Sequence, residues 1–136
     1  MLSIEQITPH LTWRLRRDVL NPGEYMHNME MEEDNHGYHF GAFEDNKLMG
    51  VVSLFKHADD WQFRKLAVIA DGQGKGIGTQ IIAYITAFVE REHGTKLWCN
   101  ARLSATGFYE KLGYKKIGDE FHKNGVDYIR MDKSLV

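Results

Sequence analysis

The apolar residues of this 136-residue chain alternate with polar residues in some segments and recur every three to four residues in others. Alternation is typical of strands, whereas the longer spacing is typical of helices. The patterns predict strands at residues 3–7, 38–43, 47–55, 61–69, 96–100, 114–121 and 126–132. They predict helical segments at residues 8–20, 24–35 and 76–93, with a further short helix before the strand at 114–121.

Proline and glycine mark the ends of the predicted helices. Thr8 followed by Pro9 is typical of an N-cap and the first helical position, and Pro22-Gly23 ends that helix. The helix at 76–93 is amphipathic, and Gly94 is its expected C-cap. No repeat or linker interrupts the chain, so we expect a single domain spanning residues 1–136.

Composition limits the class of protein. A formal net charge of −2, without clusters of Lys and Arg, argues against a nucleic-acid partner. The single cysteine, Cys99, excludes an internal disulfide framework, and its alternation with Leu97 places it in the core. No segment has the pattern of a signal peptide or of a membrane span. We therefore expect a cytoplasmic protein with no membrane partner.

The stretch Gln73-Gly74-Lys75-Gly76-Ile77-Gly78 carries the clearest chemical signal. It joins the strand predicted at 61–69 to the helix predicted at 76–93. The first N–H groups of a helix have no partner inside it, and they lie at the positive end of the helix dipole. Glycines let a ligand approach this backbone closely. The stretch therefore predicts a phosphate or pyrophosphate site, to which Lys75 adds a cation.

The spacing of the glycines distinguishes between phosphate-binding motifs. A Walker loop needs Ser or Thr after its lysine, which Lys75 lacks, and no register completes the dinucleotide pattern G-x-G-x-x-G/A. Gln73, Gly76 and Gly78 instead fill the pattern Q/R-x-x-G-x-G/A. The loop thus resembles the pyrophosphate loop of the GNAT superfamily of acyl-CoA N-acyltransferases. The alternative, a plain flexible turn, would need fewer glycines.

A second segment, Asn100 to Tyr114, strengthens the resemblance because Ala105 to Tyr114 fits the GNAT pattern A-x-x-F-Y-x-K-x-G-[FY]. In that family the tyrosine at the Tyr109 position points at the sulfur of the cofactor. A phenol within hydrogen-bonding reach of a thiolate can act as its general acid. Alone, Phe108-Tyr109 would be an ordinary aromatic pair that packs a helix on a sheet.

The resemblance covers nearly the whole chain, and it is greatest to a small bacterial branch of uncharacterised acetyltransferases. The segments that suggest this branch are residues 15–23, 63–68 and 100–102. The resemblance implies a GNAT fold, in which about four helices flank a central, mixed, mostly antiparallel sheet of six to seven strands. It implies an enzyme that moves an acetyl group from acetyl-CoA to a primary amine.

The resemblance also implies the roles of individual residues. Gln73 and the N–H groups from Gly74 through Lys75, Gly76, Ile77 and Gly78 to Thr79 would hold the pyrophosphate. The pantetheine arm would run along Leu66, Ala67 and Val68. The Val68 N–H would polarise the acetyl carbonyl, as in an oxyanion hole. Asn100 and Ser104 would contact the arm, and Tyr109 would protonate the leaving thiolate. Arg102 stands where the family more often has Asn.

The general base is left open by the sequence. Some family members use a glutamate where this chain has Gln62, which cannot accept a proton. The candidates are Asp60, His57, His39 or a water relay, since histidine has a suitable pKa. The missing carboxylate also motivates an alternative function, a non-catalytic acyl-CoA-binding sensor or partner subunit.

The acceptor amine, a small molecule or a peptide, is also open. In this superfamily the first helices and the last hairpin build the acceptor pocket, which here means residues 16–33 and 121–128. The acidic run Glu30 to Asp34 either attracts a cationic amine, such as a polyamine, an aminoglycoside or a lysine side chain, or forms a solvated loop. We expect a monomer or a homodimer.

No metal site is expected. His36 and His39 are three residues apart, a spacing that places them on opposite faces of a strand, and no Cys-x-x-Cys pair is present.

Overall fold

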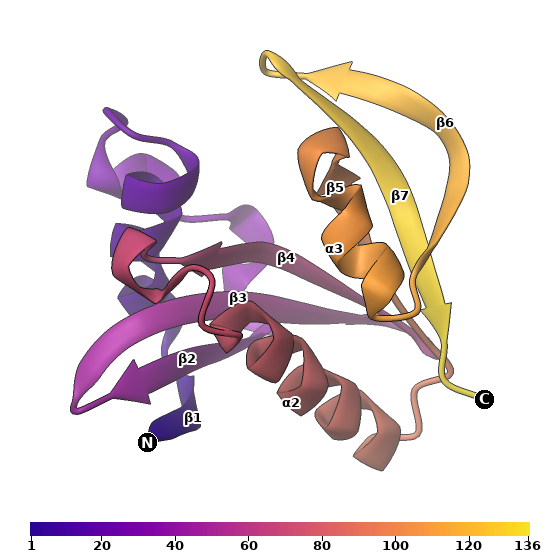
Figure 1. Ribbon diagram of the computed structural model, residues 1–136, viewed down its shortest axis with the longest axis horizontal. Helices are drawn as coiled ribbons and strands as arrows, with labels where there is room; N and C mark the ends of the chain where they lie inside the picture. Colours follow the sequence, from indigo (N-terminus) through magenta and orange to yellow (C-terminus); the bar gives the residue numbers. More distant parts are fainter. The chain divides into compact units, whose positions relative to one another are not determined.

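The structure, a computed structural model, describes residues 1–136 and contains a seven-stranded mixed sheet with three α-helices (Figure 1). The strands are β1 (Leu2–Ile7), β2 (Tyr38–Glu44), β3 (Lys47–His57), β4 (Asp60–Val68), β5 (Lys96–Arg102), β6 (Lys115–Lys123) and β7 (Val126–Ser134). The helices are α1 (Trp13–Leu15), α2 (Ile77–Arg91) and α3 (Thr106–Lys111). The predicted α+β class is confirmed, although there are three α-helices rather than about four.

Hydrogen bonding joins the strands in the order β1-β2-β3-β4-β5-β7-β6. The β1–β2, β2–β3, β5–β7 and β6–β7 pairs are antiparallel, whereas β4 and β5 are parallel. The β4–β5 ladder is confined to Asp60–Gln62 of β4. The chain divides into two compact units, and β4 supplies residues to both. Unit 1 comprises residues 1–55 and 63–87, and unit 2 comprises residues 56–62 and 88–136.

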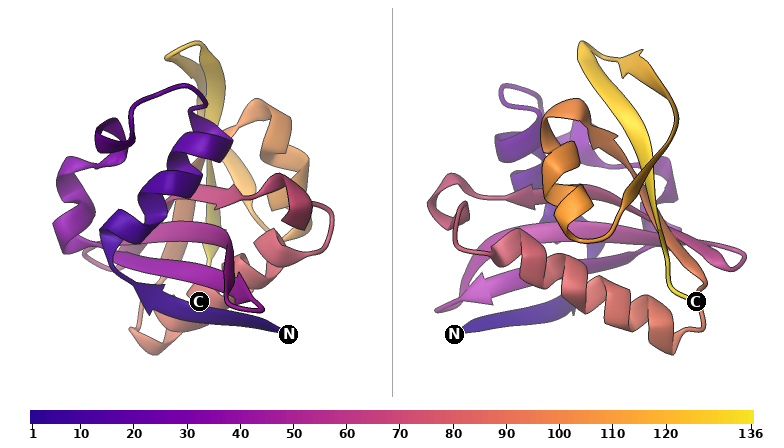
Figure 2. Two further views of the ribbon diagram at one scale, coloured as in Figure 1. Left: turned by 90° about the vertical axis from the view of Figure 1, so that its left-hand side faces the viewer. Right: turned by 45° about the vertical axis from the view of Figure 1, so that its right-hand side comes forward.

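The helical segment predicted at 8–20 is continuous but irregular (Figure 2, left). A 3-10 turn at Pro9–Thr12 leads into α1, which continues as a π-helical turn at Arg16–Leu20. Pro9 occupies the first turn as predicted, but the Thr8 hydroxyl does not cap the helix. It hydrogen-bonds Nδ1 of His10 instead, at 3.0 Å. π-Helical turns are rare and occur mostly near functional sites.

The segment predicted at 24–35 as a short helix folds as two separate 3-10 turns, Met26–Met29 and Glu32–His36. The residues before the two turns, Tyr25 and Met31, both have an extended backbone, so the turns do not merge into one longer helix. His36 lies in the second turn and not on a strand, so its predicted place on a strand face is wrong.

The core of unit 1 forms around β3, which is buried along Met49–Phe55. Leu15 of α1 packs with Val51 and Ala67. Gly50 lets α2 approach the sheet, because a Cβ at this position would lie 2.8 Å from Cδ1 of Ile81. This close packing fixes the N-terminal half of α2 against β3 and the end of β4.

The core of unit 2 forms around Trp61, Leu97 and Met131, which are fully buried. Gly94 is required here because a Cβ would lie 2.6 Å from the indole of Trp61. The left-handed residue that ends α2 is His93, with φ of +62°, and not the predicted Gly94. Cys99 is 3% exposed and packs in this core, as predicted.

Strand β6 is an edge strand that pairs only with β7, and all nine of its residues are exposed. Its register shifts between Ile117 and Phe121, and Gly118 within this irregular stretch has φ of +74°. A bulge of this kind bends the strand and raises its twist. Near the hairpin turn, the ring of Phe121 stacks on Tyr128 of β7, with ring centres 5.6 Å apart.

A buried ion pair connects four segments of unit 1. The Arg16 guanidinium donates from Nη1 and Nη2 to the two carboxylate oxygens of Asp34, at 2.8 and 2.9 Å. Nη1 also donates to the Met29 carbonyl, and Nη2 to Oγ of Ser53, both at 2.8 Å. Arg16 and Asp34 are 1% and 2% exposed, so the charges compensate each other inside the protein. The hydrogen bonds from Arg16 and Met31 hold the pKa of Asp34 below its usual value despite its burial.

His39 extends this network. Nε2 lies 2.8 Å from the Asp34 carbonyl, which can only accept, so Nε2 carries the proton. Nδ1 lies 2.7 Å from Oγ of Ser53 and accepts its proton, since that oxygen already accepts from Arg16. The arrangement is satisfied only by a neutral imidazole. Burial lowers the pKa of His39 in agreement with this assignment.

We expect Asp34→Asn to lower the free energy of unfolding by about 3–5 kcal/mol, because it leaves the Arg16 charge buried without a partner. The matched control is Asp18→Asn, which removes an exposed carboxylate paired with Arg17 and should cost less than about 1 kcal/mol. Urea unfolding measures both. Equal losses in the two variants would show that the buried pair does not stabilise unit 1.

Acid should destabilise the protein through His39. Its folded-state pKa is lowered from 6.5, so the unfolded chain binds the extra proton first. The contribution of neutral His39 to the free energy of unfolding is complete above pH 6.5. It is lost as the pH falls toward the folded-state pKa, by at most about 1.4 kcal/mol per pH unit. Urea unfolding at neutral and mildly acidic pH should show this slope in the natural protein and a smaller slope in His39→Gln. Parallel pH profiles for the two proteins would refute the assignment.

Candidate functional site

The glycine-rich loop of unit 1 has the geometry of an anion site. Gly74 and Gly76 both have φ of +79°, a conformation that other residues rarely adopt, and a Cβ at either position would meet no atom within 4 Å. The first helical bond of α2 runs from the Gln80 N–H to the Gly76 carbonyl, at 3.0 Å. The N–H groups of Ile77, Gly78 and Thr79 therefore have no partner within the helix.

The charge at this helix end also suits an anion. The first turn of α2 contains no acidic side chain, so nothing in it offsets the positive end of the dipole. Lys75 is exposed beside it. The open space around the glycines and the free N–H groups together fit a phosphate or pyrophosphate.

Gln73 anchors the loop. Its side-chain Nε2 donates to the carbonyl of Val68 at 3.0 Å, and its backbone N–H donates to Ala70 at 3.2 Å. The side-chain amide has a second N–H group. Gln73 thus fastens the loop to the end of β4, and its predicted part in binding the cofactor stays a prediction.

The end of β4 carries Leu66, Ala67 and Val68, which lie outside the ladder that β4 forms with β5. Lys65, just before them, has φ of +58° although it lies within the strand. A left-handed residue in a strand marks a local irregularity that re-aims the neighbouring side chains and backbone groups. The backbone edge of these three residues that would face β5 is therefore not used in the β4–β5 ladder.

In unit 2, Tyr109 lies on α3 and is 8% exposed. Its ring makes edge contacts with Phe108 and Tyr114, with ring centres 5.1 and 5.8 Å apart. Burial, with a smaller contribution from the nearby Cys99, raises the pKa of the phenol. The phenol is therefore protonated over the whole physiological range and can donate a hydrogen bond or a proton.

Asn100 does not share a face with the residues around Tyr109. Along β5, Cys99 and Ala101 are buried whereas Asn100 is exposed, so its side chain points to the opposite face of the strand. Cys99 adjoins Tyr109, so Asn100 projects away from that side. Its predicted contact with the pantetheine arm would have to be made from that exposed face and stays a prediction. Ser104 lies in the exposed 3-10 turn that leads into α3.

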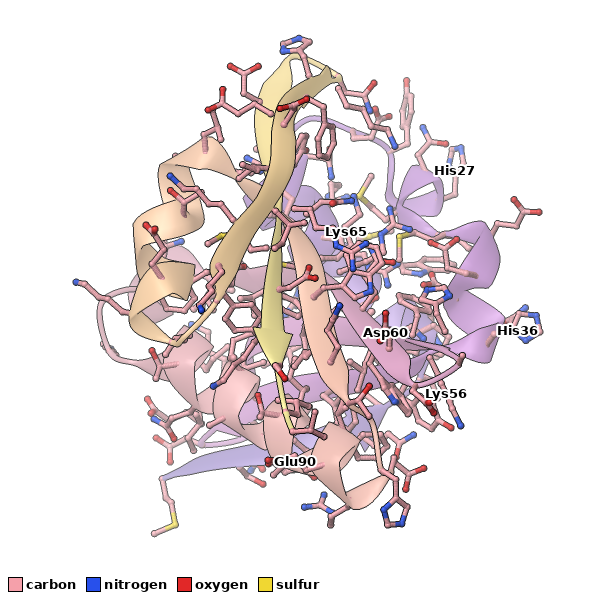
Figure 3. The ribbon with its side chains drawn as sticks, turned by 90° about the vertical axis from the view of Figure 1, so that its right-hand side faces the viewer. His27, His36, Lys56, Asp60, Lys65 and Glu90 are labelled. Atoms are coloured by element: carbon pink, nitrogen blue, oxygen red, sulfur yellow. The ribbon has the colours of Figure 1, made fainter.

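The structure separates the candidates for a general base. Both ring nitrogens of His39 are hydrogen-bonded in the interior, so it has no free nitrogen for a substrate proton. His57 is exposed, with its ring 6.5 Å from that of Trp98. Asp60 begins β4 at the hairpin turn, beside Lys56 (Figure 3). Gln62 lies opposite Trp98 in the β4–β5 ladder.

Unit 1 contains a pocket of about 200 Å3, and most of its lining residues lie within residues 16–33, one of the two segments expected to build an acceptor pocket. Its walls come from the π-helical turn, the segment that follows it, and β4. The lining residues are Arg16, Asn21, Glu24, Asn28, Met29, Met31 and Lys65. Because the Arg16 network holds Met29, Met31 and Asp34 in place, the buried ion pair also shapes this pocket.

The acidic run Glu30 to Asp34 is less charged than its sequence indicates. Asp34 is neutralised by Arg16, and Glu33 forms an ion pair with Arg64 of β4. Glu30 and Glu32 remain exposed. The run is therefore in part a structural element and not a free anionic patch.

Two further features concern the chain as a whole. No three His, Cys, Asp or Glu side chains lie together in an arrangement that could hold a metal ion. None of the helices combines the length and the apolar content that crossing a membrane requires.

Comparison with known proteins identifies the family. The model of the acetyltransferase (GNAT) domain matches residues 14–135. The uncharacterized N-acetyltransferase YitI of Bacillus subtilis (strain 168) is 27% identical, over 99% of this chain and 97% of its own length.

Solved structures share the fold. A Lactobacillus plantarum protein classed among the N-acetyltransferases has a TM-score of 0.89 at 17% identity, covering 99% of each chain. A GNAT family acetyltransferase from Elizabethkingia anophelis, solved with acetyl-CoA bound, has a TM-score of 0.78 at 19% identity, covering 98% of each chain. The resemblance inferred from the glycine loop and the segment around Tyr109 is confirmed, and the protein belongs to the GNAT acetyltransferase family.

Proposed function

We propose that this protein is an acetyl-CoA-dependent N-acetyltransferase that acts on a primary amine, and that residues 1–136 make up a single N-acetyltransferase domain. The observation that carries the proposal is the loop at Gly74–Thr79, which presents unpartnered N–H groups at the start of α2. Family membership supports acetyl transfer, and a relative of the same fold was solved with acetyl-CoA bound.

The proposed cofactor site uses backbone groups of unit 1. The N–H groups of Gly74, Lys75, Gly76, Ile77, Gly78 and Thr79 would hold the pyrophosphate, with Gln73 keeping the loop attached to Val68. The backbone of Leu66, Ala67 and Val68 would bind the pantetheine arm, since β5 does not use it. Asn100 and Ser104 are kept as predicted polar contacts to the arm.

The reaction that we propose is direct transfer. Acetyl-CoA supplies an acetyl group activated as a thioester. The Val68 N–H stabilises the negative charge that develops on the acetyl oxygen. The acceptor nitrogen forms the new C–N bond as the C–S bond breaks, and Tyr109 donates to the leaving sulfur. Because its pKa is raised, the phenol remains protonated at alkaline pH and can donate a hydrogen bond to the leaving sulfur.

The amine must lose a proton during the reaction. We place the base among Asp60, His57 or a bound water, because the nitrogens of His39 are already engaged. The acceptor is a small molecule or a peptide. A protein that binds acetyl-CoA but turns over no amine would instead be an acyl-CoA-binding sensor.

The first prediction for this function concerns cofactor binding. Acetyl-CoA and CoA should raise the melting temperature, whereas NAD and ATP should not. At a ligand concentration of a hundred times Kd, the gain in the free energy of unfolding is about 2.7 kcal/mol. Gly76→Glu should abolish this shift by placing a carboxylate in the anion site. Gly125→Glu is the matched control, because Gly125 also has φ of +79° with open space around it.

The two glutamate variants share the backbone strain and the added charge, so only position distinguishes them. A CoA-induced shift that survives in Gly76→Glu, or is lost equally in both variants, would contradict the assignment of the loop.

The second prediction concerns Tyr109. Tyr109→Phe should lower kcat about a hundredfold or more, with the CoA-induced shift in melting temperature preserved, because only the proton donor is removed. Tyr114→Phe, a buried neighbour on the same ring cluster, should retain most activity. The natural enzyme should show no alkaline loss of rate from Tyr109 below about pH 10, the ordinary pKa of tyrosine. Unchanged kcat in Tyr109→Phe would exclude it as the donor.

A further inference from the structure

The pocket of unit 1 has a single carboxylate on its walls, and this carboxylate belongs to Glu24. The acidic run Glu30 to Asp34 contributes only Met31 to the walls, and two of its carboxylates are already paired with arginines. A cationic group inside the pocket would therefore meet Glu24, which lies outside the run that the sequence indicated.

The carboxylate of Glu24 is oriented by its neighbours and keeps one oxygen for a ligand. Its Oε1 accepts from Nδ2 of Asn28 at 2.8 Å and from the Tyr25 N–H at 3.0 Å. The hydrogen bond from Asn28, followed by that from Tyr25 and by the charge of the nearby His27, lowers the pKa of Glu24. Glu24 is thus ionised at neutral pH, and its Oε2 accepts no hydrogen bond within the protein.

Two amide oxygens on the same walls also accept no hydrogen bond. Nδ2 of Asn28 donates to the Glu24 carboxylate, which can only accept, so the orientation of this amide is fixed. Nδ2 of Asn21 lies 3.5 Å from the Arg16 carbonyl and 3.9 Å from Sδ of Met29. An ammonium has three N–H donors and no acceptor. One carboxylate oxygen and two amide oxygens therefore match it in number and in kind.

A nitrogen that is bound by Glu24 cannot itself be the nitrogen that is acetylated. A carboxylate beside an amine favours the protonated form and so raises the pKa of that amine. A protonated amine has no lone pair with which to attack the acetyl carbon. A ligand held by this wall therefore needs a second nitrogen, which is neutral when it reacts.

The pocket also reaches the strand along which the acetyl group would lie. Lys65 of β4, labelled in Figure 3, is one of the lining residues. It directly precedes residues 66–68, whose backbone is proposed to bind the arm that carries the acetyl group. A ligand with its cationic end at Glu24 would thus extend across the pocket toward this part of the strand.

The remaining walls limit the rest of the ligand. The thioethers of Met29 and Met31 form an adaptable apolar surface that suits methylene groups. The charge of Arg16 is matched by Asp34, and Lys65 already interacts within the protein, so no cation on the walls is left for a carboxylate of the ligand. The volume of about 200 Å3 is below the roughly 300–1,000 Å3 of pockets for drug-sized ligands. A short aliphatic chain meets these limits, whereas an amino acid or an aminoglycoside does not.

Resting on the proposed acetyltransferase function, we infer that the acceptor is a short aliphatic diamine. Glu24, with Asn21 and Asn28, binds one of its nitrogens as an ammonium. The other nitrogen, in its neutral form, bonds to the acetyl carbon as the C–S bond breaks. That nitrogen releases one proton to the base, and the sulfur of CoA gains one proton. The products are the N-acetyldiamine and free CoA.

Matched amines test this inference, because cadaverine and putrescine differ from pentylamine and butylamine only by the second amino group. The natural enzyme should prefer each diamine by at least about tenfold in kcat/KM. Lysine, which adds a carboxylate to cadaverine, should be a poorer substrate than cadaverine. Equal rates for diamines and monoamines, or faster turnover of lysine than of cadaverine, would overturn the inference.

Glu24 is tested by a pair of variants. Glu24→Gln should remove most of the preference for cadaverine by raising its KM, with little change in kcat or in the rate with pentylamine. Glutamine still accepts the hydrogen bond from Asn28, so the variant should fold. The matched control is Glu32→Gln, which removes an exposed carboxylate of the acidic run that does not line the pocket, and it should keep the preference. Equal losses in the two variants would refute the role of Glu24.

A lysine side chain in a peptide is also an aliphatic amine, so a peptide acceptor is the nearest alternative. The natural enzyme should turn over cadaverine faster than a short peptide with one internal lysine. The opposite order would overturn the inference and assign the pocket to a peptide.

Calorimetry separates this inference from the proposed function. If no amine is turned over, cadaverine binding to the natural protein without acetyl-CoA, lost in Glu24→Gln but kept in Glu32→Gln, still supports the pocket assignment. Absence of cadaverine binding, in a protein whose melting temperature rises with acetyl-CoA, overturns the pocket assignment and leaves the acetyltransferase proposal standing.

Discussion

The pairing of Arg16 with Asp34 is the interaction on which the organisation of unit 1 depends. A guanidinium and a carboxylate cannot remain buried unless each compensates the other and most of the remaining donors find acceptors. The four hydrogen bonds of the Nη groups reach Met29, Asp34 and Ser53, whereas the buried Nε has no hydrogen-bond partner. Segments with little regular structure of their own are thereby held against β3. The same pair holds the residues that line the pocket in place.

The cofactor site that we propose depends on backbone and not on side chains. Left-handed glycines, the free end of α2 and the stretch of β4 that does not pair with β5 all act through N–H and C=O groups. Side-chain chemistry enters through Tyr109, whose protonation is secured by burial. Such a division would let one scaffold keep its acyl donor while the surface that selects the acceptor changes.

Local patterns predicted much of the fold, because periodicity and turn residues are properties of neighbouring positions. The strands, α2 and the glycine loop were found in this way. The Arg16–Asp34 pair joins residues 18 positions apart, and no local pattern indicates which carboxylate an arginine meets. The anchoring role of Gln73 likewise depends on where the end of β4 lies. The exposure of Asn100 could have been predicted from the sequence, because the alternation that places Cys99 inside also places Asn100 outside.

The exposed edge of β6 in unit 2 affects how the protein associates in concentrated solution. Strand β6 leaves one row of backbone donors and acceptors unpaired, and such an edge is a template for another chain. The irregular register around Gly118 twists this edge, and Lys115, Lys116 and Lys123 lie along it together with Asp119 and Glu120. A foreign strand would meet both a curved ladder and a row of charged side chains. The same exposed strand that contributes little to the core is thus shaped to resist self-association by strand addition.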